Sequence, residues 1–267
     1  MNHKAFTSRL SLSAAGNCAI LLAIALALPA CAQQQPPTLP PPSEGYVFPA
    51  HQTLTFNVDW RVFTAGTAVF HLETVGTQEK ITASADTIGA VNMLFPVEDR
   101  YQSVFDTKTG CSASFSKQIS EGRSKITSDL NFDYAAGKQK QTEKNVVKGT
   151  VRQTEAPIPA CVTDSLSGIF YAASQRMVTG TDFTFPLGDT LRTVPVTMKV
   201  LGREEIKTPS GTYQTIRVQP TADAGIVKNR GNIVIWYTDD ARHMPVQIKA
   251  FLFWGTITFH LQSVENK

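Results

Sequence analysis

Residues that could bind a metal ion or move a proton are scattered along this sequence of 267 residues. A zinc site is usually built from Cys and His at short spacings. No Cys-x-x-Cys pair occurs, and no two histidines lie within five residues of each other. The histidines expected to remain after processing are His51, His71, His243 and His260. The sequence therefore predicts no metal site and no cofactor.

Motifs for nucleophilic catalysis are absent as well. There is no Gly-x-Ser-x-Gly elbow, no Ser-x-x-Lys with its companion motifs, and no glycine loop for phosphate. Acids stand beside arginines at Glu98–Arg100 and Asp239–Arg242, and a polar turn with surface ion pairs explains the second group. We predict no catalytic residues and a protein that is not an enzyme. A hydrolase assembled from scattered polar residues is the alternative.

Two cysteines, Cys111 and Cys161, lie in the predicted folded part of the chain. Compartments outside the cytoplasm are oxidising, so an even pair there predicts a disulfide. Such a bond would close a loop of about 50 residues and stabilise the fold by about 4 kcal/mol at most. Two independent buried thiols are the alternative.

The first 32 residues are typical of a signal peptide. A short basic region with Lys4 and Arg9 precedes an apolar run of about 13 residues, which is too short to span a bilayer. Ala30-Cys31-Ala32 is a small-residue cleavage signature, whereas Leu28-Pro29-Ala30-Cys31 resembles a lipobox. We expect a soluble product in the periplasm or cell envelope. Lipidation of Cys31, giving an outer-membrane-anchored lipoprotein, is the alternative.

The remaining charge is small and evenly spread. Loss of Lys4 and Arg9 lowers the formal net charge from +3 to +1, and no cluster of basic residues follows. Nucleic-acid binding needs clustered Lys and Arg, so we expect no nucleic-acid partner. We also expect no membrane association unless Cys31 is lipidated.

Residues 33–45 are rich in proline, which favours an extended, solvated chain, so they are predicted to form a tether. Residues 46–267 are predicted to form a single β-rich domain. Its main signal is period-2 alternation of apolar residues, as in a strand with one buried face. The alternating sets begin at Leu54, Ala68, Ile126, Val194, Tyr213 and Ile233.

One segment breaks this pattern. Asp164 can cap a helix, and Gly180 can end it. Apolar residues at helical spacing between them predict an amphipathic helix over Ser165–Val178 that packs on the sheet. The fold class is therefore mainly β: a curved antiparallel sheet or partial barrel with one amphipathic helix packed on it.

Two apolar segments could serve a ligand. Val91–Pro96 could form a lip over an apolar molecule, or it could plug the end of the sheet. The continuous run Phe251–Trp254 could line a cavity, or it could be buried on both sides. The residues that we predict to line or gate a ligand site are Phe56, Trp60, Phe70, Met93, Phe95, Phe170, Phe253 and Trp254.

Several short motifs, in their order, resemble the bacterial exported family called domain of unknown function 3108. They are Asp164–Ser167 with Tyr171, Val194–Val196, Ile206–Tyr213, Ile235–Asp240 and Met244–Val246, and the resemblance extends over about Leu54–Leu261. It implies an exported envelope protein and carries no catalytic residues. The pattern also resembles the half-barrels of periplasmic lipoprotein carriers, which is an analogy of fold.

The leading hypothesis is a non-enzymatic envelope protein that binds an apolar or lipid-like ligand inside a curved β-sheet. The second hypothesis is an interaction or structural protein with a solid core that contacts another envelope protein.

Overall fold

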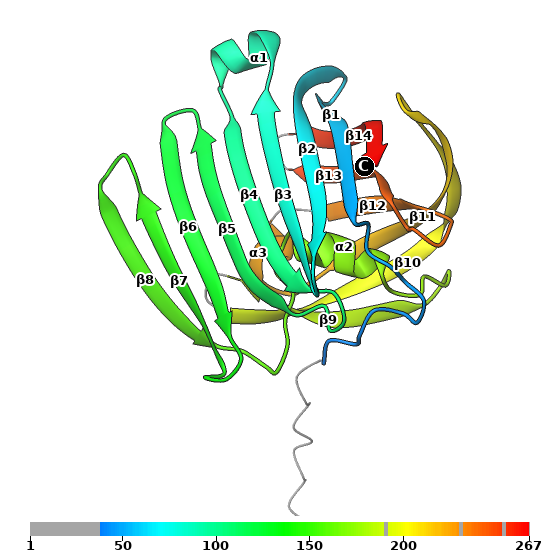
Figure 1. The fold of residues 1–267 in the computed structure, drawn as a ribbon. Helices are drawn as coiled ribbons and strands as arrows, with labels where there is room; N and C mark the ends of the chain where they lie inside the picture. The colour runs from blue at the N-terminus through cyan, green and yellow to red at the C-terminus, as the bar shows by residue number, and fades with distance from the viewer. Residues whose placement is uncertain (1–37, 190–191, 230–231, 253–254, 267) are drawn as a thin grey trace, which may run out of the picture. The chain divides into compact units, whose positions relative to one another are not determined.

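The computed structural model describes residues 38–189, 192–229, 232–252 and 255–266. Strands β1 to β14 form one antiparallel sheet (Figure 1). The strands are β1 (His51–Trp60), β2 (Phe63–Val75), β3 (Gln78–Thr87), β4 (Glu98–Asp106), β5 (Ser112–Glu121), β6 (Ser124–Asp133), β7 (Lys138–Asn145), β8 (Thr150–Pro157), β9 (Asp182–Asp189), β10 (Arg192–Thr208), β11 (Gly211–Thr221), β12 (Asn232–Thr238), β13 (Pro245–Leu252) and β14 (Gly255–Asn266). The short helices are α1 (Gly89–Leu94), α2 (Ser167–Ala173) and α3 (Gly225–Asn229).

The sheet order follows directly from hairpin connections. It runs β8-β7-β6-β5-β4-β3-β2-β1-β14-β13-β12-β11-β10-β9, so strands that are consecutive in the chain are neighbours, with β8 and β9 as the one exception. β1 pairs with β14, which joins the two ends of the domain, and β8 and β9 form the two edges. Because these edge strands are not paired with each other, the sheet is a partial barrel, as predicted.

The alternation seen in the sequence sets which face of each strand is buried. In β1, Leu54 and Phe56 are fully buried. Their cross-strand partners on β2 are Phe70 and Ala68, respectively. A side-chain period of two places such residues on one face of a sheet. The alternating sets that begin at Leu54 and Ala68 therefore lie on neighbouring strands of one hairpin.

Helix α2 lies within the curve of the sheet (Figure 1). Six of its seven residues are buried, because its side chains pack into two different apolar clusters. Leu166, just before α2, and Phe170 join the cluster around Phe56, whereas Tyr171 and Ala173 join the cluster around Phe185. The helix is shorter than the predicted Ser165–Val178 and is enclosed by the sheet, so little of it remains polar and exposed.

The segment before β1 packs against this helix. The Tyr171 hydroxyl donates a 2.7 Å hydrogen bond to the Pro40 carbonyl, and the Gln175 side chain donates one to the Pro41 carbonyl. The Ser43 amide bonds to the carbonyl of Ser174. Part of the predicted tether is therefore attached to the domain through its backbone carbonyls, which proline leaves available.

Candidate functional site

Three of the predicted ligand-lining residues meet in the interior of the sheet. The Phe56 and Phe70 rings have centroids 5.5 Å apart in an edge-to-face arrangement, and the Phe70 and Phe170 centroids are 6.0 Å apart. Edge-to-face packing of this kind stabilises aromatic pairs. These rings fill the space between β1, β2 and α2, so they make a packed cluster.

The other predicted residues lie elsewhere. Trp60 is 41% exposed at the end of β1, Met93 is 86% exposed on α1, and Phe95 is 53% exposed just after it. The segment Val91–Pro96 therefore does not plug the sheet, since none of the residues of α1 is buried. Phe253 and Trp254 lie outside the described residues.

An apolar cavity of about 180 Å³ lies between α2, α3 and the inner face of β9 to β13. Ser165 is the one polar residue among those that line it. The lining residues are Ser165, Gly168, Ile169, Phe185, Leu187, Val196, Met198, Pro220, Val227, Ile233, Ile235 and Ile248. None of the six predicted ligand-binding residues that the structure describes is among them, although the alternating sets of β10 and β12 did place Val196, Met198, Ile233 and Ile235 on a buried face.

The cavity has one side close to solvent. Phe185, Val196 and Ile235 on its inner wall are buried, whereas Val227 of α3 and Ile233 of β12 are half-buried. A molecule could therefore enter past α3 without opening the core cluster around Phe56. Aliphatic walls with almost no hydrogen-bonding groups favour a hydrocarbon over a polar ligand.

A fully buried polar cluster stabilises the N-terminal end of α2. The hydroxyls of Ser103 and Ser112 donate to Asp164 Oδ2 at 2.6 and 2.7 Å, and the amides of Leu166 and Ser167 donate to Asp164 Oδ1. All four of the polar side chains involved, including Ser167, are 0% exposed. The predicted capping role of Asp164 is confirmed, and it also ties the helix to β4 and β5. Because the cluster is sealed from solvent and these hydrogen bonds join the carboxylate to serine hydroxyls and backbone amides, its geometry fits a structural role.

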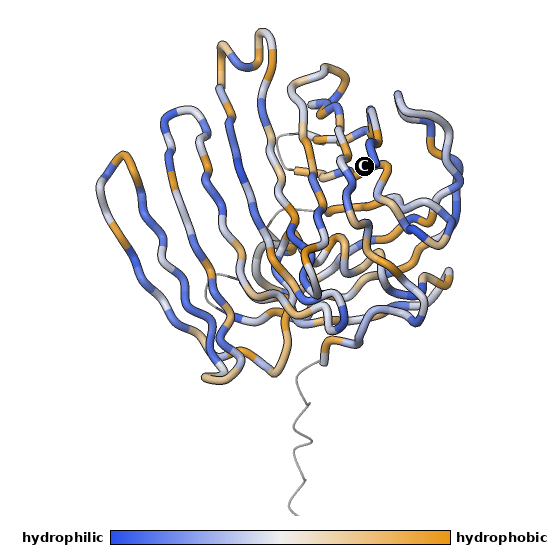
Figure 2. The backbone as a smooth tube through the Cα atoms, viewed as in Figure 1, coloured by the Kyte–Doolittle hydropathy of each residue, from blue (hydrophilic) through white to orange (hydrophobic). Residues whose placement is uncertain are grey.

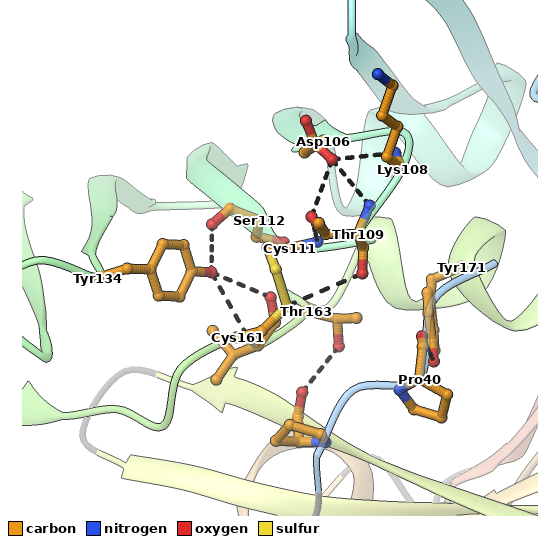
Figure 3. Close-up of a disulfide and its surroundings, with 12 residues drawn as sticks. Pro40, Asp106, Lys108, Thr109, Cys111, Ser112, Tyr134, Cys161, Thr163 and Tyr171 are labelled. Carbon is orange, nitrogen blue, oxygen red and sulfur yellow. Dashed lines mark hydrogen bonds between the residues drawn. A yellow bond between two sulfur atoms is a disulfide. The ribbon is translucent and has the colours of Figure 1, made fainter.

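A disulfide joins Cys111 and Cys161 beside this cluster (Figure 3). The predicted bond is therefore confirmed. It fixes the segment between β8 and α2, whose Val162 carbonyl accepts a hydrogen bond from the Ser112 amide. On its other side, the Thr163 amide bonds to the Pro186 carbonyl of β9. The segment thus bridges β5 and β9 and fixes the start of α2 relative to both strands.

Tyr134 contacts both β5 and the segment that bridges β5 and β9. Its hydroxyl donates a 2.6 Å hydrogen bond to the Ser112 carbonyl (Figure 3). The pKa of this hydroxyl is raised to about 12, because burial and the nearby Asp164 carboxylate outweigh the lowering by a hydrogen bond that the Val162 amide donates to it. The side chain is therefore neutral and can serve as a donor throughout the physiological range.

The polar residues considered for chemistry are dispersed. His71 bonds to the Thr53 hydroxyl, His243 to the Ala173 carbonyl, and His260 lies 3.6 Å from Asp59. In the part of the chain that the structure describes, no group of three or more His, Cys, Asp and Glu side chains is placed to hold a metal ion.

Asp240 and Arg242 form a turn, as predicted. The Arg242 Nε donates to Asp240 Oδ2 at 3.0 Å, and the Thr238 hydroxyl donates to Oδ1. Burial raises the pKa of Asp240, but the hydrogen bonds from Arg242 and Thr238 outweigh it and lower the pKa below its ordinary value.

Glu79 is a buried carboxyl that was not singled out from the sequence. Its Oε2 accepts a 2.5 Å hydrogen bond from the Thr74 hydroxyl, while its buried Oε1 has no hydrogen-bond partner among the described residues. Its pKa is raised to about 7, because burial and the charge of Glu73 outweigh the lowering by the hydrogen bond from Thr74. It is an acid at an inward position of β3, two residues before Ile81, and this strand was not predicted from the sequence.

Among the described residues, no helix has the length and apolar character needed to cross a bilayer. A family model described as protein of unknown function (DUF3108) matches residues 55–262. No curated protein matches the sequence.

The solved structures that resemble the chain include the following two. One is a β-barrel-like protein of domain of unknown function DUF1849 from Brucella abortus, with a TM-score of 0.57, 9% sequence identity, and coverage of 83% of this chain and 99% of that chain. The other, from Bacteroides fragilis, has a YmcC-like fold, with a TM-score of 0.36, 8% identity, and coverage of 82% and 99%. The likeness to the first structure shows a common fold, in agreement with the predicted half-barrel.

Proposed function

The chain belongs to the DUF3108 family of proteins of unknown function, and we propose that it is an exported envelope protein that binds an apolar or lipid-like ligand inside its curved β-sheet. In this proposal it holds the ligand without catalysing a reaction. The apolar cavity between α2, α3 and β9 to β13 is the observation that carries the proposal.

The size and chemistry of the cavity support a hydrocarbon ligand. An apolar cavity of about 150 Å³ in a protein can stay dry and bind a molecule the size of benzene. The cavity here is about 180 Å³, enough for a compact apolar group or the end of an acyl chain. With Ser165 as its one polar lining residue, recognition would depend on shape and on removal of apolar surface from water.

Export rests on the sequence. The signal segment of residues 1–32 and the disulfide between Cys111 and Cys161 both fit an oxidising compartment outside the cytoplasm. Residues 1–32 lie outside the described residues. The soluble periplasmic form and the form anchored through Cys31 would both place the same domain in the envelope.

A second candidate function is an interaction protein with a solid core. The packed Phe56, Phe70 and Phe170 rings favour it, because they fill the space that was first expected to hold a ligand. In this case the cavity beneath α2 would be a packing defect, and a partner protein would bind to the outside of the sheet.

Titration with a fluorescent fatty acid, followed by displacement with dodecanoate, would test the proposal. We expect saturable binding by the unmodified protein. Ile248→Phe and Val196→Phe add volume at two walls of the cavity and should weaken binding at least tenfold. Leu201→Phe is the matched control, because Leu201 is 40% exposed on β10 and does not line the cavity. Absence of saturable binding, or equal binding by the cavity variants, would rule out this site.

A further inference from the structure

The turns that join the strands of the N-terminal half gather at one end of the sheet. In an antiparallel meander, every second turn lies at the same end. The four turns are Arg61–Val62, residues 88–97 with α1, Gly122–Arg123 and residues 146–149, and we call them the turn rim. Figure 1 shows these four turns along the upper ends of β1 to β8.

Exposed apolar side chains concentrate on the turn rim. Of the fifteen large hydrophobic residues that are exposed among the described residues, ten lie in these four turns or within two residues of them. They are Trp60, Val62, Phe63, Ile88, Met93, Leu94, Phe95, Val146, Val147 and Val151. Figure 2 shows hydrophobic colouring at the tips of the β1–β2, β3–β4 and β7–β8 turns. Scattered exposed apolar residues are ordinary, but a concentration at one end marks an interaction surface.

The most exposed part of the rim is held in place by its backbone. The Ile88 amide bonds to the Ala65 carbonyl of β2 at 3.0 Å, and the Gly122 amide bonds to the Pro96 carbonyl at 2.8 Å. The Phe95 ring lies against Gly122, where a Cβ atom would come within 2.9 Å of it. These contacts fix the turn to both neighbouring hairpins, yet no residue of α1 is buried. Its side chains are therefore presented outward on a fixed backbone.

The tips of the turn rim are basic. The four turns contain Arg61, Arg123 and Lys148 and no acidic residue, whereas five acidic residues and two further lysines lie on the strands within two residues of them. The Arg61 guanidinium lies over the Trp60 ring, 5.8 Å from the ring centroid. Apolar side chains that insert between lipid headgroups, flanked by basic residues that meet anionic headgroups, are typical of proteins that lie on a membrane surface. Two copies that met through these tips would instead bring the basic residues together.

We propose that the turn rim docks onto the surface of an anionic lipid bilayer, with the side chains of α1 inserted and Arg123 and Lys148 at the headgroups. The contact does not depend on a lipid at Cys31. It also does not depend on the ligand cavity, because none of the rim residues lines that cavity.

Vesicle flotation would test this docking. Every version of the exported, processed chain would carry Cys31→Ser, so that no lipid anchor can form. We expect the unmodified rim to bind vesicles of equal phosphatidylglycerol and phosphatidylcholine, and to bind pure phosphatidylcholine vesicles several-fold less. Met93→Ser/Leu94→Ser should lower binding to the anionic vesicles at least tenfold. Val47→Ser/Val75→Ser is the matched control, because both residues are exposed but lie outside the rim, and it should bind normally.

A variant with reversed charges tests the docking without changing any residue of α1. Arg123→Glu/Lys148→Glu should weaken binding to anionic vesicles at least tenfold and leave the urea unfolding midpoint unchanged. Failure of the unmodified chain to float with the vesicles would overturn the proposal, as would equal binding by both rim variants. A dimer in sedimentation velocity that the rim variants convert to monomers would show instead that a second copy covers this surface. These outcomes are read without any fatty-acid probe, so they are separate from the test of the cavity.

Discussion

The Ser103 hydroxyl of β4 donates a 2.6 Å hydrogen bond to Asp164 Oδ2, although the two residues are 61 positions apart in the chain. Both side chains are fully buried. The same carboxylate caps α2 through the amides of Leu166 and Ser167. One acid therefore sets both the start of the helix and its position against the sheet, and the position of α2 shapes one wall of the apolar cavity.

Asp164→Ala should lower the free energy of unfolding by about 3 kcal/mol or more, because it removes a helix cap and leaves several buried donors without an acceptor. Ser103→Ala removes one donor and should cost about 1–2 kcal/mol. Urea denaturation would measure both values. Asp129→Ala is the control, since Asp129 is exposed on β6, and should change stability by less than about 0.5 kcal/mol. An Asp164→Ala variant as stable as the control would contradict the role given to this cluster.

The disulfide should stabilise the segment that bridges β5 and β9. It closes a loop with a sequence separation of 50 residues, for which the chain-entropy model gives about 4 kcal/mol. The double variant Cys111→Ala/Cys161→Ala should therefore unfold at markedly lower urea concentration. Non-reducing against reducing peptide mapping provides a direct check of the bond. Recovery of both cysteines as free thiols from the exported protein would contradict the structure.

Glu79 should make stability depend on pH. Its pKa is raised from 4.5 to about 7 in the folded state, mainly by burial, so between these values the folded state holds a proton that the unfolded state releases. Stability from this group is therefore present below about pH 4.5 and is lost as pH rises through about 7, by about 3 kcal/mol in total. The loss of unfolding free energy between pH 5 and pH 8 should be smaller in Glu79→Gln than in the unmodified chain. Parallel pH profiles for the two proteins would exclude this assignment.

Much of the fold follows from local patterns. Alternation of apolar residues predicted β1, β2, β10 and β12, because a strand with one buried face needs a period of two. The Asp164 cap was visible because a carboxylate before an apolar helical pattern has few other uses. The disulfide followed from the compartment and the even number of remaining cysteines.

The site was harder to predict because its residues come together from distant strands. Val196 and Ile235 were recognised as buried, but the sequence does not show that α2 leaves a gap above them. The large aromatic residues Phe56 and Phe70 were expected to line a ligand site, and their rings pack against each other. Met93 was expected to line or gate a ligand site, and it is 86% exposed. An apolar residue in a short turn can be left uncovered when hydrogen bonds from the turn backbone hold the segment.

The central claim is that the cavity beneath α2 holds an apolar ligand, and native mass spectrometry of the exported protein tests it most directly. Lipid extraction of the same sample would identify any adduct. The account predicts a hydrocarbon-containing molecule bound to the unmodified protein, lost in Ile248→Phe and retained in Leu201→Phe. A protein that carries no adduct and takes up no added fatty acid, or an adduct that persists unchanged in Ile248→Phe, would contradict it.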